Sequence, residues 1–144
     1  MISFRLVNCT TTLVLSLGIL TPIIGRGSEG KLIAQGAKLE KVIGDLQFSE
    51  GPAWHPDGYL LFEDIPRNRI MKLEAGDKVS VFREPSGQSN GLAFDKEGRL
   101  IAAEGNSAGG GRRISRTDKD GRVVTLADRY NGKRLNSPND LAID

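Results

Sequence analysis

The sequence predicts an all-β fold of the β-propeller type, here an incomplete propeller of about two and a half blades. The first observation is an internal repeat, in which Ser49–Phe62 matches Ser89–Ala102 position by position. The second is that each copy holds four short strands, and about 40 residues with four strands is the period of one propeller blade. The third is that no helical stripe of comparable length follows residue 38. Another all-β meander is the structural alternative.

The predicted strands and turns follow the same order in both copies. An apolar strand leads into a turn that contains Gly58 or Gly98, and glycine supplies the positive φ that such turns require. A second strand, a third strand that begins with Arg-Ile, another turn and a β-branched strand complete the unit. The predicted strands are 52–54, 59–62, 69–73 and 79–82 in the first copy, and 92–94, 99–103, 113–117 and 123–126 in the second.

A third copy begins at Pro138 and runs to Asp144, the last residue of the sequence. Propellers close with roughly four to eight blades, so two blades and one further strand leave sheet faces open. We therefore expect the 144-residue chain to be a fragment or partial gene product that is poorly stable alone.

The N-terminus predicts export. Arg5 precedes an apolar stretch over Cys9–Gly25, and small residues follow at a spacing that suits cleavage before Ser28 or before Ala37. A membrane anchor is the alternative, but Pro22 and the modest apolar length argue against a stable membrane span. We expect a signal peptide over residues 1–27, a lead-in over 28–45 and the partial propeller over 46–144. The protein would then be periplasmic or extracellular.

Composition limits the classes of partner. The formal net charge is +2 and no basic run is interleaved with aromatic residues, so we expect no nucleic-acid partner. The single cysteine, Cys9, cannot form an internal disulfide.

The repeat places three polar residues at one equivalent position. Glu50, Asn90 and Asn139 each stand just before the first strand of a blade, and in a propeller these positions converge at the mouth of the central channel. Carboxylate and carboxamide oxygens brought together there are the donors that calcium, magnesium or manganese prefer. The alternative is that an asparagine before Gly or Asp only forms a turn, with its side chain bonded to the backbone.

Several segments together resemble the family of senescence marker protein, gluconolactonase and luciferin-regenerating enzyme. Single segments are weak evidence, but the resemblance is nearly continuous over residues 46–144. The segments that carry it are Phe48–Trp54, Leu61–Ile70, Ser89–Phe94, Arg112–Thr117 and Leu135–Leu141.

The resemblance implies a six-bladed propeller with a divalent cation in its channel, and a hydrolase of sugar lactones or related esters. Glu50 corresponds to the first metal ligand of the family. Asn139 corresponds to the Asn of the Pro-Asn-Asp motif, which contacts the substrate, the metal or its water, and Asn90 is a further candidate for substrate binding. The remaining ligands and the general base would lie beyond residue 144. We expect calcium, with magnesium, manganese or zinc as alternatives, and no activity from these residues alone.

Other candidate sites are weaker. His55 is the only histidine and is expected to be a surface turn residue, so a histidine-based zinc site has no support. No Gly-x-Ser-x-Gly elbow supports a serine nucleophile, and the loop Gly105–Gly111 lacks the Lys-Ser/Thr of a phosphate loop. Glu63 and Asp64 could line the channel, although turn or ion-pair roles are favoured. The alternative function is a non-catalytic propeller that binds a ligand or a protein.

Overall fold

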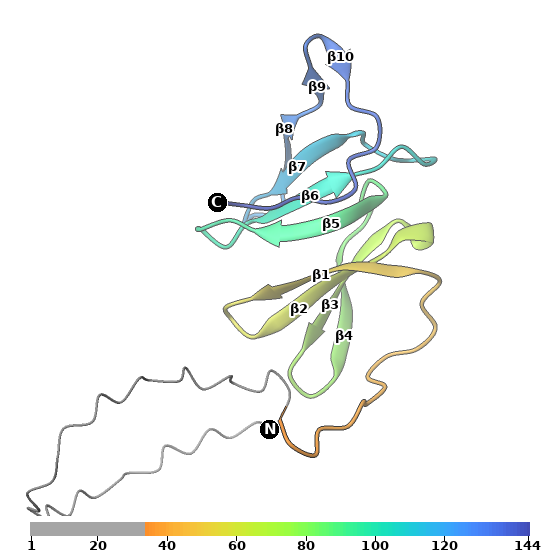
Figure 1. Ribbon diagram of the computed structural model, residues 1–144, viewed down its shortest axis with the longest axis vertical. Coiled ribbons are helices and arrows are strands. Elements are labelled where there is room, and N and C mark those ends of the chain that lie inside the picture. The colour runs from red at the N-terminus through yellow and green to blue at the C-terminus, as the bar shows by residue number, and fades with distance from the viewer. Residues whose placement is uncertain (1–33) are drawn as a thin grey trace, which may run out of the picture. The chain divides into compact units, whose positions relative to one another are not determined.

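The computed structural model describes residues 34–144, of which Lys41–Asp144 form one compact unit. The predicted signal peptide lies outside the described residues. Two four-stranded antiparallel sheets follow one another along the chain, with strand orders β1-β2-β3-β4 and β5-β6-β7-β8 (Figure 1). The all-β prediction of an incomplete propeller is confirmed.

The strands match the predicted repeat, and two small elements were not predicted: the 3-10 helix η1 and the hairpin of β9 and β10. Blade 1 contains β1 (Ser49–His55), β2 (Tyr59–Asp64), η1 (Ile65–Arg67), β3 (Arg69–Glu74) and β4 (Lys78–Arg83). Blade 2 contains β5 (Ser89–Phe94), β6 (Leu100–Glu104), β7 (Arg113–Thr117) and β8 (Val123–Ala127), and is followed by β9 (Arg129–Tyr130) and β10 (Lys133–Arg134).

The two blades share their register as well as their order. Ser49 pairs with Asp64 at the start of β1, and Ser89 pairs with Glu104 at the start of β5. Both ladders then shift register, between Glu50 and Ala53 in β1 and between Ser89 and Leu92 in β5. Glu50 and Asn90 lie within the first residues of β1 and β5, whereas the sequence predicted them to stand before these strands. Glu50 still pairs with Glu63, whereas the shift in β5 leaves Asn90 without a ladder partner.

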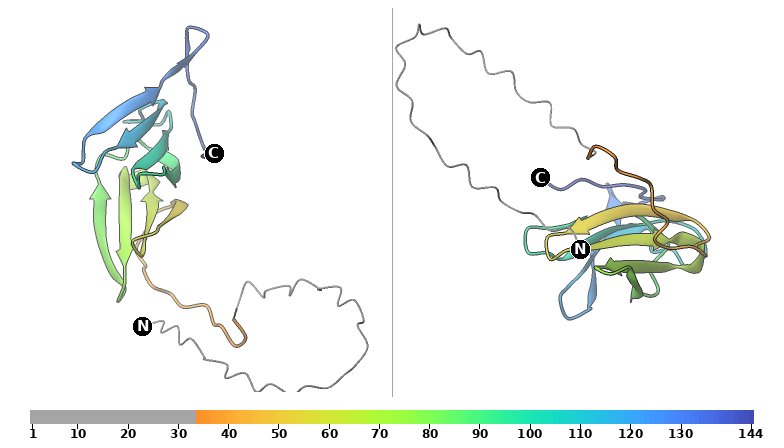
Figure 2. Two further views of the ribbon diagram at one scale, coloured as in Figure 1. Left: turned by 90° about the vertical axis from the view of Figure 1, so that its left-hand side faces the viewer. Right: turned by 90° about the horizontal axis from the view of Figure 1, so that it is seen from below.

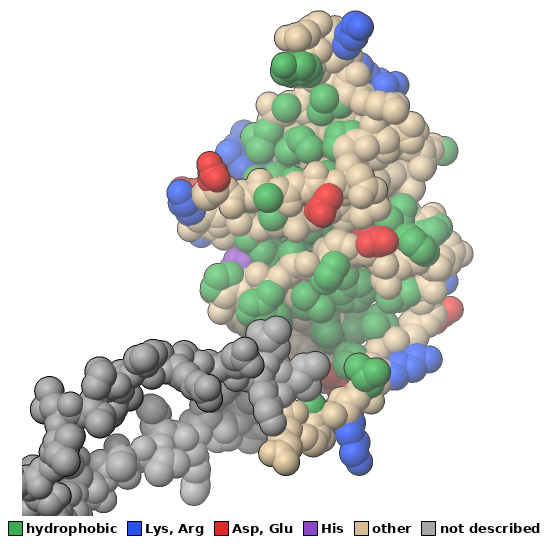
Figure 3. Space-filling view, in the orientation of Figure 1, with side chains coloured by type: hydrophobic (Ala, Val, Ile, Leu, Met, Phe, Trp, Pro, Cys, Tyr) green, Lys and Arg blue, Asp and Glu red, His purple; other side chains and the backbone are tan. Residues whose placement is uncertain are grey.

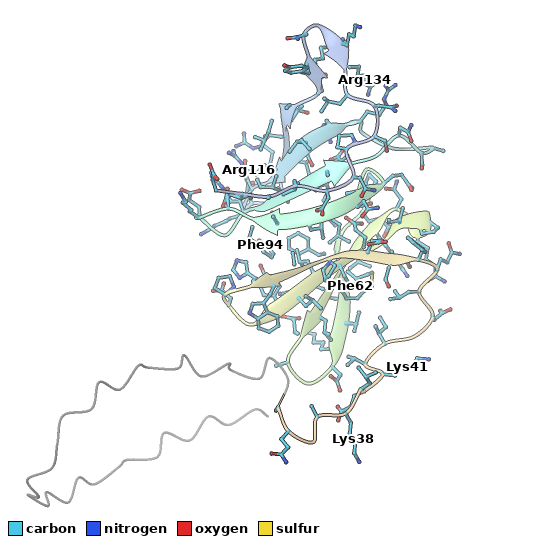
Figure 4. All side chains as sticks on the ribbon, viewed as in Figure 1. Lys38, Lys41, Phe62, Phe94, Arg116 and Arg134 are labelled. Carbon is cyan, nitrogen blue, oxygen red and sulfur yellow. The ribbon has the colours of Figure 1, made fainter. Side chains whose placement is uncertain are left out.

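The blades pack face to face through a common apolar core. Figure 2 shows the two sheets next to each other. Phe94 lies on the side of β5 that faces β1 and packs against this core (Figure 4). Removing these side chains from water is the main non-directional force between the sheets. The core consists of Ala53, Leu61, Ile70, Leu92, Leu100 and Ala102.

The expectation that His55 is a surface turn residue is wrong. The residue is 7% exposed, and its ring stacks on Tyr59 at 4.4 Å between ring centroids, with Phe94 edge-on at 4.6 Å. The Asp57 N–H donates to His55 Nδ1 at 3.1 Å. The imidazole therefore lies at the end of the β1–β5 interface that is opposite Glu50, because His55 is the last residue of β1 and Glu50 is near its start.

A buried ion pair joins the blades on their polar side. Arg83, the last residue of β4, donates from Nη2 to Glu104 Oε1 of β6 at 2.5 Å and to the Ser86 carbonyl at 3.0 Å. Arg113 donates from Nε to Glu104 Oε2 at 2.8 Å. Burial alone would raise the pKa of Glu104, but hydrogen bonds from Arg113 and Arg83 outweigh it and hold that pKa below its ordinary value.

Two glycines make room for this carboxylate. A Cβ at Gly87 or at Gly111 would overlap the Glu104 side chain, so neither position can hold a larger residue without displacing it. Gly87 also has a φ of +78°, which glycine adopts without steric cost. The loop before β5 and the loop before β7 thus both pack closely against the buried side chain of Glu104.

Apolar side chains remain on the open face of the blades. Trp54 on β1 is 66% exposed and Phe48 is 55% exposed, and Figure 3 shows hydrophobic side chains over both sheets on this face. Within residues 34–144 there is no helix of the length and apolarity that a membrane crossing requires.

We predict that Glu104→Gln destabilises the fold by roughly 3 kcal/mol, because it leaves the buried Arg83 without a charged partner. Urea unfolding followed by circular dichroism measures this difference. Glu97→Gln is the matched control, since the Glu97 side chain pairs with Arg99 at the surface and exposed pairs contribute little. Equal unfolding midpoints for Glu104→Gln and wild type would show that the pair does not hold the blades together.

Candidate functional site at the blade rim

The structure brings the three predicted rim positions side by side. Gly51, directly after Glu50, has a φ of +57°, and a Cβ there would overlap the backbone carbonyl oxygen of Asn90. The Gly91 N–H donates to the Asn139 carbonyl at 2.7 Å. The backbone at the three rim positions therefore lies side by side in the order 50, 90, 139. The strand predicted for the third copy, over residues 138–144, is not formed in the structure.

Glycine directly after Glu50 and directly after Asn90 allows this close approach. A Cβ at Gly91 would lie 2.6 Å from Asp140 Oδ1 and 2.9 Å from the Asn139 carbonyl oxygen, closer than real Cβ atoms come. The Gly-for-Gly match between 51 and 91 therefore reflects backbone packing between blades as well as turn geometry. Any side chain at either position would push the neighbouring rim residue away.

The side chains at these positions are accessible to solvent. Glu50 and Asn139 are exposed and Asn90 is half-buried. Within the part of the chain that the structure describes, neither asparagine side chain makes a hydrogen bond to the backbone, which the turn-forming alternative requires. Figure 3 shows isolated acidic side chains on this face where the two sheets meet.

A buried acid lies beneath the rim. Glu63 on β2 pairs with Glu50 across the β1–β2 ladder, yet its side chain is fully buried. The Ser89 hydroxyl donates to Glu63 Oε1, whereas Oε2 has no hydrogen-bond partner among the described residues. Burial raises the pKa of Glu63 to about 8, against the weaker opposing effects of Ser89 and Arg83.

The ion-pair role expected for Asp64 is correct, and that for Glu63 is wrong. Arg67 Nη1 and Arg69 Nη2 lie 3.0 Å and 3.1 Å from Asp64 Oδ2. Burial opposes ionisation of Asp64, but hydrogen bonds from the Gln47 N–H and the two arginines hold its pKa below the ordinary value. The alternation of β2 could have predicted that the two acids have different surroundings, because consecutive residues of a strand point to opposite faces.

Residues 48–144 match the family described as SMP-30/Gluconolactonase/LRE-like region. The chain belongs to this family. The gluconolactonase of Zymomonas mobilis subsp. mobilis is 36% identical over 118 residues, which cover 72% of this chain and 32% of that protein.

Solved structures of gluconolactonase relatives share the fold of this SMP-30/gluconolactonase chain. One, provisionally assigned as a gluconolactonase, superposes with a TM-score of 0.68 at 31% identity and covers 76% of this chain and 37% of its own. The gluconolactonase from Xanthomonas campestris superposes with a TM-score of 0.58 at 39% identity, covering 64% and 30%. The chain thus spans about a third of the length of the relatives it matches.

The donor atoms at the rim of this SMP-30/gluconolactonase chain suit a hard cation. One carboxylate, Glu50, and two carboxamides, Asn90 and Asn139, offer oxygen ligands on adjacent backbone segments. Within residues 34–144 no group of three His, Cys, Asp or Glu side chains is close enough to share an ion. His55 is buried among aromatic rings, so a zinc site that needs nitrogen ligands does not fit. The rim supplies part of an oxygen coordination shell.

Glu63 should make stability fall as pH rises. Its folded-state pKa of about 8 exceeds the ordinary 4.5, so between these values the folded chain holds a proton that the unfolded chain has lost. The free energy of unfolding then decreases with pH by at most about 1.4 kcal/mol per pH unit, and levels off above the folded-state pKa. Glu63→Gln should remove this decrease.

Urea unfolding at pH 5, 6, 7 and 8 tests the prediction for the wild type, Glu63→Gln and the surface control Glu97→Gln. Only Glu63→Gln should flatten the profile. Parallel profiles for the wild type and Glu63→Gln would show that Glu63 is ionised in the folded protein.

Proposed function

We propose that this chain forms the N-terminal blades of a divalent-metal-dependent hydrolase of sugar lactones or related esters. The observation that supports the proposal is the stacking of Gly51 on Asn90 and of Gly91 on Asn139. These contacts are between the backbone segments that carry Glu50, Asn90 and Asn139, in a family whose similar members include gluconolactonases.

Each rim residue has a role that follows from its chemistry. The Glu50 carboxylate and the Asn139 side-chain oxygen would hold the cation, with calcium favoured and magnesium or manganese as alternatives. When bound, such an ion polarises a lactone carbonyl and stabilises charge on its oxygen. The Asn90 and Asn139 carboxamides, with an acceptor and two donors each, would orient the hydroxyl groups and carbonyl of a sugar lactone.

The stacked backbone explains why these groups suit a catalytic rim. The separation of their backbone segments is fixed by glycine contacts and by the 2.7 Å hydrogen bond from Gly91, so only the side chains would need to adjust when a substrate arrives. Preorganised polar groups of this kind stabilise charge that develops during acyl transfer. The remaining ligands and the general base would come from further blades, so we expect no turnover from the 144-residue chain alone.

The decisive test measures hydrolysis of δ-gluconolactone by pH-stat on the full gene product and on the 144-residue chain. We expect turnover only from the full product, with loss on chelation and recovery on addition of Ca²⁺. Glu50→Gln keeps the side-chain shape and removes one ligand charge, so it should lower activity at least tenfold.

Glu97→Gln is the control, because Glu97 lies in an exposed turn at the other end of its blade. Turnover that chelation leaves unchanged would refute the metal-dependent function. Lactone binding without turnover would instead support the non-catalytic propeller.

We also propose that the protein is exported, on the strength of the apolar stretch Cys9–Gly25 and the small residues that follow it. Expression of the full gene product with fractionation of the cell should place it outside the cytoplasm. N-terminal sequencing of that product should start at Ser28 or at Ala37. An intact Met1 on the recovered protein would contradict this prediction.

A further inference from the structure

The loop between β6 and β7 stands at the rim. Gly105 follows Glu104, which pairs with Ser89 at the start of β5, and the Gly105 N–H donates to the Gln88 carbonyl at 3.0 Å. The loop therefore lies beside the strand start that carries Asn90. Its counterpart in blade 1 is the short helix η1 (Figure 1).

Arg112 ends this loop in a constrained conformation. Its φ is +51°, in the left-handed region that residues other than glycine rarely adopt. Its N–H donates to the Gly105 carbonyl at 3.0 Å and so closes the loop. A non-glycine residue is held there only when other contacts over-determine it, and the side chain makes such contacts.

The Arg112 guanidinium fastens the segment that leads into blade 3. Its Nε donates to the Leu135 carbonyl at 2.9 Å and to the Asn136 carbonyl at 3.0 Å. Hydrogen bonds from a charged donor are roughly twice as strong as neutral ones. Within the described residues, Arg112 lies in no ion pair, so its charge is directed to these two carbonyls.

Contacts in the opposite direction hold the same two segments together. Arg134 of β10 donates from Nη2 to the Gly111 carbonyl at 3.1 Å (Figure 4). A Cβ on Gly105 would lie 3.3 Å from Ser137 Oγ, so the loop and the segment are in close contact. The loop and residues 135–137 thus form a clasp.

The clasp acts directly on Asn139. The segment is fixed at residues 135 and 136 by Arg112 and at residue 139 by the hydrogen bond from Gly91. Only Ser137 and Pro138 lie between these anchors, and the ring of Pro138 fixes its φ. The Leu135 N–H also donates to the Asp128 carbonyl at 2.8 Å, so Arg112 is one of two anchors at the start of this segment, and it contributes to the place of Asn139 on the rim.

We propose that Arg112 is a positioning residue for Asn139, and that it holds the third rim position against the second. The importance of Asn139 to catalysis rests on the proposed function; the clasp itself rests on the hydrogen bonds alone. Loss of the guanidinium should free the start of blade 3 from β5 while leaving the sheet of blade 2 intact.

The test measures amide hydrogen exchange by NMR in the 144-residue chain. Arg112→Gly removes the guanidinium and accepts the left-handed backbone, whereas Arg112→Lys keeps the charge but loses the Nε donor. Exchange of the Gly91 N–H should rise about tenfold or more in Arg112→Gly, because a charged hydrogen bond is lost, and by less in Arg112→Lys. The Ile114 N–H of the β6–β7 ladder should be unaffected.

Arg122→Ala is the matched control, since Arg122 bonds only within its own turn, to Asp118 at 3.1 Å. Unchanged Gly91 exchange in both Arg112 variants would overturn the proposal. If Arg112→Gly loses protection from hydrogen exchange throughout the chain, the result for Arg112→Lys decides. A selective rise in the exchange rate of the Gly91 N–H in Arg112→Lys would still support the clasp.

A Ca²⁺ titration of the full gene product, as wild type and as Arg112→Gly, separates this proposal from the proposed function. Ca²⁺-dependent shifts at Glu50 and Asn139 in the wild type, with a Ca²⁺ affinity at least tenfold lower in Arg112→Gly, would support both the ion site and the role of Arg112. No Ca²⁺ effect in the wild type would count against the ion site, and Gly91 exchange would still decide the role of Arg112.

Discussion

The arrangement of this rim depends on the buried carboxylate of Glu104. Arg83 approaches it from the last strand of blade 1, and Arg113 approaches it from blade 2. Apolar packing between sheets is non-directional, so the core alone permits the blades to slide. A buried pair with fixed geometry does not, because displacement leaves a charge without a partner in the interior. Glu104 also pairs with Ser89, so it fixes where β5 starts and therefore where Asn90 meets blade 1.

The rim violates the repeat at one informative position. Glu63 follows the apolar part of β2, and its register counterpart on β6 is Ala103, which is fully buried. A neutral acid with one oxygen unpartnered is less favourable there than alanine. Departures from local rules concentrate at functional sites, and this departure lies directly across the ladder from Glu50. The buried Glu63 thus lowers the stability of the fold next to Glu50, the one rim position of the three that offers a carboxylate.

The repeat alone was sufficient to predict the strand order, the glycine turns and the alignment of Glu50 with Asn90, because all of these recur in each copy. It could not predict contacts made by residues that do not recur. Arg83 has no counterpart of its kind in blade 2, where Ala127 stands opposite Ile114 as Arg83 stands opposite Ile70. The sequence around His55 is that of an ordinary turn, but Tyr59 of its own blade and Phe94 of the next blade cover its ring.

Because the rim oxygens come from different segments of the repeat, binding of the proposed ion would be linked to blade assembly. An ion that contacts Glu50 and Asn139 together binds only the arrangement in which Gly51, Asn90 and Gly91 are stacked, and so it stabilises that arrangement by its own binding free energy. The same linkage would work in reverse: contacts that hold residues 135–139 against β5 would raise the affinity of the rim for the proposed ion. A propeller can therefore adjust its site through contacts such as those of Arg112, which touch no ligand and lie outside the strands.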